Sequence, residues 1–261
     1  MAVDLARAAG EVLRARPEHV DVAATKTSPT DVVTEMDRSA ERAILDRLLA
    51  VRPDDSVVSE ESAARVGTSA VRWYVDPLDG TVNYLYGLPH YAVSIAAEVD
   101  GVTACGVVLD VDRKVEFTAL RGEGAWRDGV PIRCSAEGDL GRSLVGTGFN
   151  YEVARRTIQA RAVATVLPLV RDIRRFGSAA LDLCDVACGR LDAFYEAGMN
   201  EWDWAAGALI AREAGARVDG LNGRPPGNHT TIAANPVLFD LLHHVLVAAD
   251  ADGENGDTTG D

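Results

Sequence analysis

Two carboxylates stand three residues apart at the end of a short apolar run, in the segment WYVDPLDGTVN. Pro77 fixes φ and has no N–H to donate, so we expect the strand to end at Asp76 and the chain to turn there. Asp76 and Asp79 would then converge on one point, and Gly80 would let the backbone approach closely before a short helix opens at Thr81. Two unit charges 4 Å apart repel by about 4 kcal/mol at an effective dielectric near 20. The pair therefore predicts a bound cation, and all-oxygen ligands favour Mg²⁺ or Mn²⁺ over zinc.

Three further segments place acids at the ends of expected elements. Glu60 and Glu61 follow the apolar run VVS, Asp203 lies between two tryptophans where a helix begins, and Asp37 lies at another helix start. Taken separately, these acids are typical of solvated strand ends and of helix N-termini. Together with the first segment, they point to one shared site.

Together, these segments resemble the inositol monophosphatase family of lithium-sensitive, metal-dependent phosphatases, which includes fructose-1,6-bisphosphatase. The similarity extends from about Ala2 to Leu246, nearly the whole chain. The matching segments are KTSPTDVVTEMD (Lys26–Asp37), SEES (Ser59–Ser62), WYVDPLDGTVNY (Trp73–Tyr84), GSAALDLCDVACGRLDAFYE (Gly177–Glu196) and EWDWAAGALIAREAGA (Glu201–Ala216).

The resemblance assigns a role to each matching residue. The family's metal ligands correspond to the side chains of Glu60, Asp76, Asp79 and Asp203 and to the carbonyl of Leu78. Its water-activating pair corresponds to Asp37 and Thr81, and its phosphate-binding amides to Gly80 and Thr81. We expect Glu60 to act with Asp37 and Thr81 in catalysis by orienting and deprotonating the attacking water. Its contacts to the sugar-alcohol part of the substrate correspond to Gly177, Ser178, Ala179 and Glu196. The resemblance implies two or three Mg²⁺ ions per site, with Mn²⁺ as a substitute.

Two neighbouring positions bear on this site. Lys26 stands where the family often has a lysine near the metals, and Ser59 replaces the glycine that usually precedes the acid pair. Because serine has a hydroxyl, we expect Ser59 to shift the loop or to bind a metal-bound water. Arg171, Arg174 and Arg175 form a basic cluster that suits a second phosphate, a solvated strand edge or a dimer contact.

The implied activity is hydrolysis of a phosphate monoester by a metal-activated water, with inositol 1-phosphate giving myo-inositol and phosphate as the first choice. Histidinol phosphate, a nucleotide 3′-phosphate and fructose 1,6-bisphosphate are the alternative substrates. A partner-binding regulator on the same scaffold is the non-enzyme alternative, although such a protein would be expected to have lost metal ligands. The family also implies a homodimer.

The elements expected in the first half would hold most of the acids. They are helices over Val3–Arg16 and Asp37–Leu49, a polar loop over Lys26–Asp37, and strands over Ser56–Ser59, Arg72–Val75, Tyr91–Val99, Val102–Leu109 and Lys114–Leu120. The Asp100-Gly101 and Asp128-Gly129 pairs mark turns, and the alternating strands favour a largely antiparallel sheet.

The second half alternates between strand-like and helical runs, which favours some parallel pairing. Its expected strands are Ser143–Thr147, Asp172–Phe176, Asp192–Glu196 and Thr231–Ala234, and its helices are Val153–Val170, Ser178–Cys188, Trp204–Ala214 and Pro236–Ala248. The fold class is therefore α/β, with an α+β N-terminal half over 1–140 and an α/β half over 141–249. The family's architecture is a layered α/β/α/β/α sandwich.

Charge and composition restrict the partners. The chain has 261 residues and a formal charge of −14, of which five acids fall in the tail 250–261, which we expect to be disordered. A strongly acidic protein is not expected to bind nucleic acid. No run of 18 apolar residues and no signal-peptide pattern occurs, so we expect a cytoplasmic protein outside the membrane, acting on a small molecule. Its four cysteines form no CxxC pair and are expected to be reduced.

Overall fold

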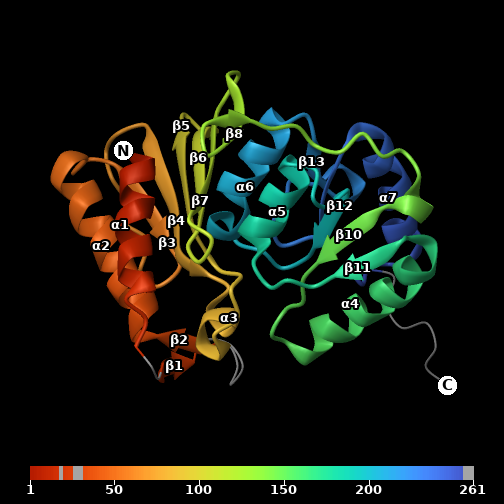
Figure 1. Cartoon of the computed structure of the whole chain (residues 1–261), viewed down its shortest axis with the longest axis horizontal. Helices are drawn as coiled ribbons and strands as arrows, with labels where there is room; N and C mark the ends of the chain where they lie inside the picture. The colour runs from red at the N-terminus through yellow and green to blue at the C-terminus, as the bar shows by residue number, and fades with distance from the viewer. Residues whose placement is uncertain (18–19, 26–31, 255–261) are drawn as a thin grey trace.

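Five alternating layers of helix and sheet make up the protein, in a computed structural model that describes residues 1–17, 20–25 and 32–254. Figure 1 shows the layers side by side: α1 and α2, a first sheet, α5 and α6, a second sheet, and α4 with α7. The predicted α/β class and the layered α/β/α/β/α sandwich are confirmed. Within the described residues, no helix is both long enough and apolar enough to span a bilayer.

The first two layers come from the N-terminal half. The outer layer is formed by α1 (Ala2–Arg14) and α2 (Glu35–Val51). The first sheet consists of β3 (Ser56–Ser59), β4 (Val71–Asp79), β5 (Ala92–Val99), β6 (Val102–Asp110), β7 (Val115–Leu120), β8 (Gly124–Arg127) and β9 (Val130–Pro131), in that spatial order. Apart from the parallel β3–β4 pair, its neighbours are antiparallel, as the sequence predicted. A ribbon of β1 (Val22–Thr25) and β2 (Val32–Thr34) lies near α3 (Thr81–Tyr86) at one end of the molecule (Figure 1).

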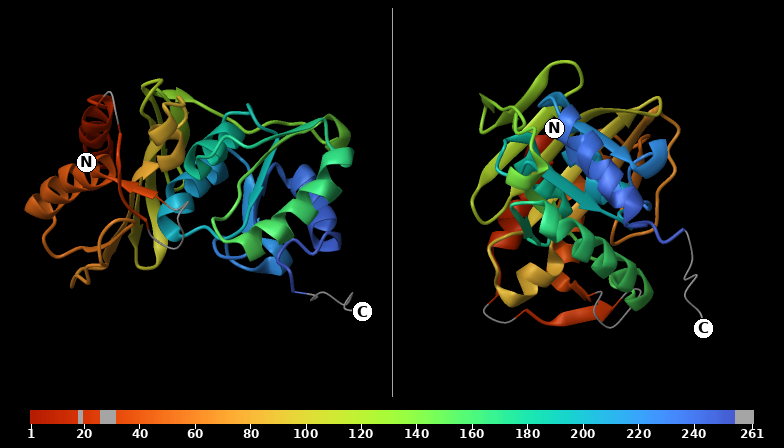
Figure 2. Two further views of the ribbon diagram at one scale, coloured as in Figure 1. Left: turned by 90° about the horizontal axis from the view of Figure 1, so that it is seen from below. Right: turned by 90° about the vertical axis from the view of Figure 1, so that its right-hand side faces the viewer.

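The other three layers come from the C-terminal half. The central layer is formed by α5 (Ala179–Ala187) and α6 (Glu201–Glu213), and the last layer by α4 (Val153–Val166) and α7 (Pro236–Ala248). The second sheet has the order β11-β10-β12-β14-β13, with β10 (Leu144–Thr147), β11 (Asp172–Arg174), β12 (Ala193–Glu196), β13 (Arg217–Gly220) and β14 (Thr231–Ala234). The β10 strand pairs in parallel with β11 and β12, and the other pairs are antiparallel. Figure 2 shows α4 and α7 together on the outer face of this sheet.

Alternation of side chains along the strands divides the interior into three apolar clusters. On β4, Val75 packs beneath α1 and α2, whereas its neighbour Tyr74 faces α5 and α6. On β12, Phe194 faces the same central helices, and Tyr195 packs on the outer side towards α7. Each sheet is therefore covered on both faces, and the helices of the central layer join the two halves.

The structure differs from the sequence analysis at Pro77. The β4 strand does not end at Asp76 but continues through Pro77 to Asp79, and its register with β5 shifts between Asp76 and Asp79. A register shift of this kind leaves a residue outside the ladder, so a proline without an N–H can lie there without interrupting the strand. The predicted short helix after Gly80 is present as α3.

Other boundaries differ because the sequence pattern is weak there. The predicted loop to Asp37 contains β2, and α2 begins at Glu35 because Thr34 caps it. The predicted helix over Val153–Val170 ends at Val166 and continues as a 3-10 turn with Pro168 near its start. The strands β1, β8, β9 and β13 were not predicted; all are two to four residues long.

The acidic tail is ordered where it begins. Residues 250–254 lie in the described chain and pack on the body, whereas the sequence analysis placed them in a disordered tail. Ala251 is buried, and the Asp252 carboxylate accepts hydrogen bonds from the backbone N–H and the hydroxyl of Thr230. One small apolar side chain and one paired acid thus anchor this segment. Residues 255–261 are outside the described part.

Candidate metal centre and active site

A cavity of about 350 Å³ lies where the ends of β4 and β12 approach the first turns of α3 and α6. It brings together the predicted metal ligands, the predicted phosphate-binding amides and most of the predicted substrate contacts. The predicted residues in its lining are Glu60, Asp76, Leu78, Asp79, Gly80, Thr81, Gly177, Ala179, Glu196 and Asp203. The other two predicted residues, Asp37 and Ser178, lie behind the lining, where they contact Thr81 and Asp79.

Parallel pairing of β3 with β4 brings Glu60 and Asp76 to the same edge of the first sheet. Ser59 is in register with Val75, so each acid is the residue that follows this pair. The Glu60 N–H donates to the Val75 carbonyl at 3.2 Å, which extends the pairing by one residue. The Asp76 carboxylate accepts the Leu78 N–H at 2.9 Å, which fixes the turn of backbone that carries the Leu78 carbonyl.

Asp79 and Asp203 are each held through one carboxylate oxygen. Asp79 Oδ2 accepts the Ser178 hydroxyl at 2.6 Å and the Ala180 N–H at 2.8 Å, both from the N-terminus of α5. Asp203 Oδ2 accepts the Asn200 N–H at 2.6 Å, across the first turn of α6. The helix begins at Glu201, so Asp203 is its third residue and not the N-cap. Both sets of contacts use Oδ2, and they orient the carboxylates from the C-terminal half of the chain.

The acids that line the cavity disfavour one another's charge. Burial and the charge of Glu60 raise the pKa of Asp76 well above its usual value, and the same two causes raise the pKa of Asp203. Burial also raises the pKa of Asp79 to about 6, although the hydrogen bond from Ser178 acts in the opposite direction. A carboxylate cluster of this kind is stabilised in its ionised form by a bound cation.

The donor atoms fit a hard divalent cation. Glu60, Asp76, Asp79 and Asp203 supply carboxylate oxygens, and Leu78 supplies a backbone carbonyl. Oxygen-only donor sets suit Mg²⁺ or Mn²⁺, whereas zinc prefers nitrogen and sulfur ligands. The pKa values of Asp76, Asp79 and Asp203 are raised, and a bound cation would favour their ionised forms, which agrees with this donor set.

Asp37 and Thr81 form a hydrogen-bonded pair at the edge of the cavity. The Asp37 carboxylate is buried and accepts the Thr34 N–H at 2.8 Å and the Thr34 hydroxyl at 2.5 Å. Its other oxygen lies 3.0 Å from the Thr81 hydroxyl, which also lies 3.0 Å from the Leu78 carbonyl. Burial raises the pKa of Asp37. The pair can therefore orient a water molecule and accept a proton from it through the Thr81 hydroxyl.

Gly80 determines how the backbone enters α3. Its φ is +92°, and a Cβ there would lie 3.0 Å from the His90 carbonyl oxygen and 3.2 Å from the Gly177 carbonyl oxygen. Both the left-handed conformation and the close approach require glycine. The amides of Gly80 and Thr81 are consequently placed in the cavity wall at the first turn of α3.

Glu196, the acid predicted to contact the substrate, lines the cavity. It ends β12, and burial raises its pKa to about 8, with the charge of Asp182 adding to this effect and that of Arg175 opposing it. A Cβ at Gly148 would overlap the Glu196 carboxylate, so a larger residue there would force this carboxylate to move. The sequence analysis did not identify Gly148, because only the fold brings it against Glu196.

Ser178 and Arg175 have surroundings that the sequence did not indicate. The Ser178 side chain is buried and donates to Asp79, whereas the resemblance assigned Ser178 to the substrate. Of the three arginines in the basic cluster, Arg175 lines the cavity. Arg174 instead pairs with Asp172, and Arg171 donates to a backbone carbonyl. The sequence alone does not indicate which of these three arginines reaches the cavity.

The two positions next to the predicted site have different outcomes. Lys26 is outside the described residues. Ser59 is buried at the end of β3, and its hydroxyl donates to the Glu41 carboxylate on α2. The Ser59 hydroxyl thus donates its hydrogen within the protein, and its binding of a metal-bound water stays a prediction.

Comparison with known proteins places this site in a family. The model of the inositol monophosphatase family matches residues 1–255. This chain belongs to that family. It is 49% identical over 227 residues to an inositol-1-monophosphatase of Mycobacterium bovis, covering 83% of this chain and 78% of that protein. It is 42% identical over 226 residues to the Nus factor SuhB of Escherichia coli, covering 85% of each.

The fold comparison agrees with the family. The crystal structure of the extragenic suppressor protein suhB from Bartonella henselae superposes with a TM-score of 0.87 at 37% identity, covering 94% of this chain and 96% of that one. The predicted relationship to the inositol monophosphatases is confirmed, and the protein is a phosphoric monoester hydrolase of this type.

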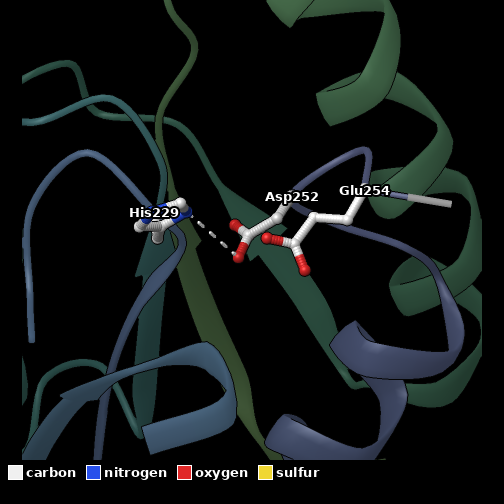
Figure 3. A group of neighbouring side chains, drawn as sticks. All are labelled: His229, Asp252 and Glu254. Atoms are coloured by element: carbon white, nitrogen blue, oxygen red, sulfur yellow. Dashed lines mark ion pairs between the residues drawn. The ribbon is translucent and has the colours of Figure 1, made fainter. Parts of the chain in front are cut away.

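A second group of metal-ligand types lies outside the lining of the cavity of this phosphatase. Figure 3 shows His229, Asp252 and Glu254 pointing towards one another, with an ion pair of 3.6 Å between His229 and Asp252. Arg224 reaches the same group: its Nη1 lies 3.0 Å from His229 Nδ1 and 3.5 Å from the Asp252 carboxylate, and it also contacts Glu254. The guanidinium therefore balances these two acids, and we assign the group to anchoring the chain near 254.

Proposed function

We propose that this phosphatase hydrolyses inositol 1-phosphate to myo-inositol and phosphate with Mg²⁺ as its cofactor. The observation that carries the proposal is one cavity whose lining includes the four carboxylates of the predicted metal site together with Glu196. The relative named inositol-1-monophosphatase, at 49% identity, supports the choice of substrate.

The metal would be held by residues from both halves of the chain. We assign Glu60, Asp76 and the Leu78 carbonyl to a first ion, and Asp76, Asp79 and Asp203 to a second. When bound, such ions lower the pKa of a coordinated water and stabilise negative charge on the phosphoryl oxygens. Because Asp79 and Asp203 are oriented by α5 and α6, the ligand set is complete only when the two halves are packed together.

The remaining groups of the site would accept a proton from the attacking water, orient that water and bind the phosphate. Asp37 accepts a hydrogen bond from Thr81, and its raised pKa suits a group that receives a proton from the attacking water through the Thr81 hydroxyl. Glu60 would help to orient that water. The amides of Gly80 and Thr81 would donate to phosphate oxygens, where hydrogen bonds that strengthen in the transition state accelerate the reaction.

On the substrate side, Glu196 would accept hydrogen bonds from the hydroxyls of the alcohol, and Gly177 and Ala179 would form the adjacent wall. Arg175 is close enough to lower the pKa of Glu196. Gly177 has no side chain and Ala179 has only a methyl group, so this wall leaves room for a ring that carries several hydroxyls. Histidinol phosphate, a nucleotide 3′-phosphate and fructose 1,6-bisphosphate are the competing substrates.

A partner-binding role is the second candidate, and it is compatible with catalysis. It is favoured by the similarity to proteins named Nus factor SuhB, at 42% identity over 85% of the chain. A regulator without activity would tolerate the loss of metal ligands, yet all four acids face the cavity here. We therefore place catalysis first.

The quaternary and cellular context follows from the family resemblance. We propose a homodimer that acts in the cytoplasm and is inhibited by lithium. Light scattering of the purified chain would give twice the mass of 27.8 kDa if the dimer forms.

The substrate is tested with a panel assayed in Mg²⁺. We expect kcat/KM for inositol 1-phosphate to exceed the values for histidinol phosphate, nucleotide 3′-phosphates and fructose 1,6-bisphosphate by at least about tenfold. Lithium added to the same assay tests inhibition. A higher kcat/KM for histidinol phosphate would overturn the substrate assignment but leave the phosphatase site intact.

A further inference from the structure

A buried carboxylate on α2 lies outside the site described above. Glu41 is 6% exposed and follows Asp37 by four residues, so the two acids lie on the same face of the helix. Asp37 is directed at Thr81, whereas Glu41 is directed at the chain that follows β3. Its Oε1 accepts the hydroxyl of Ser59 and, at 3.1 Å, the hydroxyl of Ser62.

The two hydroxyls flank the segment that carries a proposed metal ligand. Ser59 immediately precedes Glu60, and Ser62 follows it by two residues, so one carboxylate oxygen on α2 holds both ends of this short segment. The Glu60 N–H is fixed separately on β4 by the Val75 carbonyl. Glu60 therefore lies in a segment restrained by α2 on one side and by the sheet on the other.

The contact between Glu41 and the two serines depends on their hydroxyl groups. A hydrogen bond to an ionised carboxylate is roughly twice as strong as one between neutral groups. Glu41 shares its helix face with the buried apolar side chains of Ile44 and Leu48, so the hydroxyls of Ser59 and Ser62 also compensate its burial. A glycine at position 59 would have no hydroxyl to donate. Which residue stands at 59 thus decides whether α2 can restrain the Glu60 segment from both ends.

We propose that Glu41 is a positioning residue for Glu60 and acts through the hydroxyls of Ser59 and Ser62. The inference rests on the proposed metal-dependent function, because its consequence is the geometry of a metal ligand. Groups that orient metal ligands in this way typically contribute about 10–100-fold to metal affinity or activity. The same helix would then orient two functional parts of the cavity, Thr81 through Asp37 and Glu60 through Glu41.

The test is Mg²⁺ binding to the metal-free protein, measured by titration calorimetry. Glu41→Gln keeps the size of the side chain but removes its charge, and we expect Mg²⁺ affinity to fall about tenfold. The matched control is Glu35→Gln on the same helix, because the Glu35 side chain is 66% exposed; it should bind Mg²⁺ within twofold of wild type. Glu60→Gln should abolish binding of the ion that Glu60 would hold, which assigns the affected part of the signal to this ion.

A double-mutant cycle separates positioning from general stability. In a Ser59→Gly background, Glu41→Gln should reduce Mg²⁺ affinity by less than it does in wild type, because one of the two contacts is already absent. Equal reductions in the two backgrounds would contradict a route through Ser59. If Glu41→Gln does not fold, as judged by circular dichroism, Ser62→Ala provides the test, since Ser62 is exposed; a two- to threefold loss of affinity is expected, and no loss contradicts the proposal.

Failure of the positioning role of Glu41 and failure of the proposed metal-dependent function give different results. If wild type binds Mg²⁺ and Glu41→Gln binds it equally well, the positioning role is wrong and the metal site stands. If wild type binds no Mg²⁺ at all, the proposed function fails, and this inference fails with it.

Discussion

Removing the Ser178 hydroxyl tests how the second half of the chain completes the metal site. Ser178 donates to Asp79 at 2.6 Å and is 1% exposed, so Ser178→Ala removes a charge-assisted hydrogen bond that water cannot readily replace. Hydrogen bonds to charged groups contribute about 1.5–3 kcal/mol, and 1.4 kcal/mol is a factor of ten. We therefore expect Mg²⁺ affinity to fall by about tenfold to hundredfold.

The assay for this variant is calorimetric titration of Mg²⁺ together with kcat and KM at saturating Mg²⁺. Because Ser178 also accepts the Leu181 N–H at the start of α5, Ser178→Ala should lower the free energy of unfolding by about 1 kcal/mol. Ser178→Thr keeps a hydroxyl for both contacts and should restore most of the Mg²⁺ affinity.

The result that refutes this reasoning is specific. If Ser178→Ala keeps its Mg²⁺ affinity within twofold but has a raised KM for inositol 1-phosphate, then Ser178 contacts the substrate, as the family resemblance implied. In that case, the hydrogen bond to Asp79 would not position a metal ligand.

Three further predictions follow from the same cavity. Thr81→Val should lower kcat about 10²–10⁴-fold with a much smaller change in KM, measured by phosphate release, because the proton route to the buried acid is lost; an unchanged kcat would exclude that route. Gly148→Ala should raise KM for inositol 1-phosphate more than it lowers kcat, because the new Cβ displaces the Glu196 carboxylate; an unaltered KM would place Glu196 away from the substrate. Stabilisation of the protein by Mg²⁺, measured as a rise in Tm, should be larger at pH 7.5 than at pH 5.5. The pKa of Asp79 is raised to about 6, so below that pH protons compete with the metal, and Asp79→Asn should reduce the difference between the two pH values.

Short-range sequence pattern was enough to predict most of the strands and helices that carry the acids. Apolar runs followed by acids predicted the strands that lead to Glu60 and Asp76, and parallel pairing of β3 with β4 then brings these side chains together. The conformation of the segment after Asp79 also follows from its own residues. Gly80 adopts the positive φ that the turn needs, and a short helix follows it. The family resemblance supplied the sandwich order, which alternation of elements alone could not define.

What the sequence could not predict depends on contacts between distant residues. Pro77 stays within β4 because a register shift against β5 accommodates it, and no local rule anticipates that partner. Ser178 is directed at Asp79, 99 residues earlier, and Gly148 lies against Glu196 on another strand. The short strand β13 has few apolar residues of its own, so its pairing with β14 defines it.

The ordered start of the acidic tail has a similar explanation. Its composition is that of a disordered segment, yet the buried side chain of Ala251 and the hydrogen bonds from Thr230 to Asp252 hold it on the body. Anchors of this kind have no signature in composition, because they depend on a surface formed by other elements.

The central claim is that the carboxylate cavity is a metal-dependent phosphatase site. It is tested most directly by phosphate release from inositol 1-phosphate, with Mg²⁺ and after metal removal, in wild type, Asp79→Asn and the control Asp46→Asn, whose residue is exposed on α2. We predict Mg²⁺-dependent turnover in wild type and in the control, and a rate at least about a hundredfold lower in Asp79→Asn. Equal rates in Asp79→Asn and wild type, or full activity of wild type without metal, would contradict the claim.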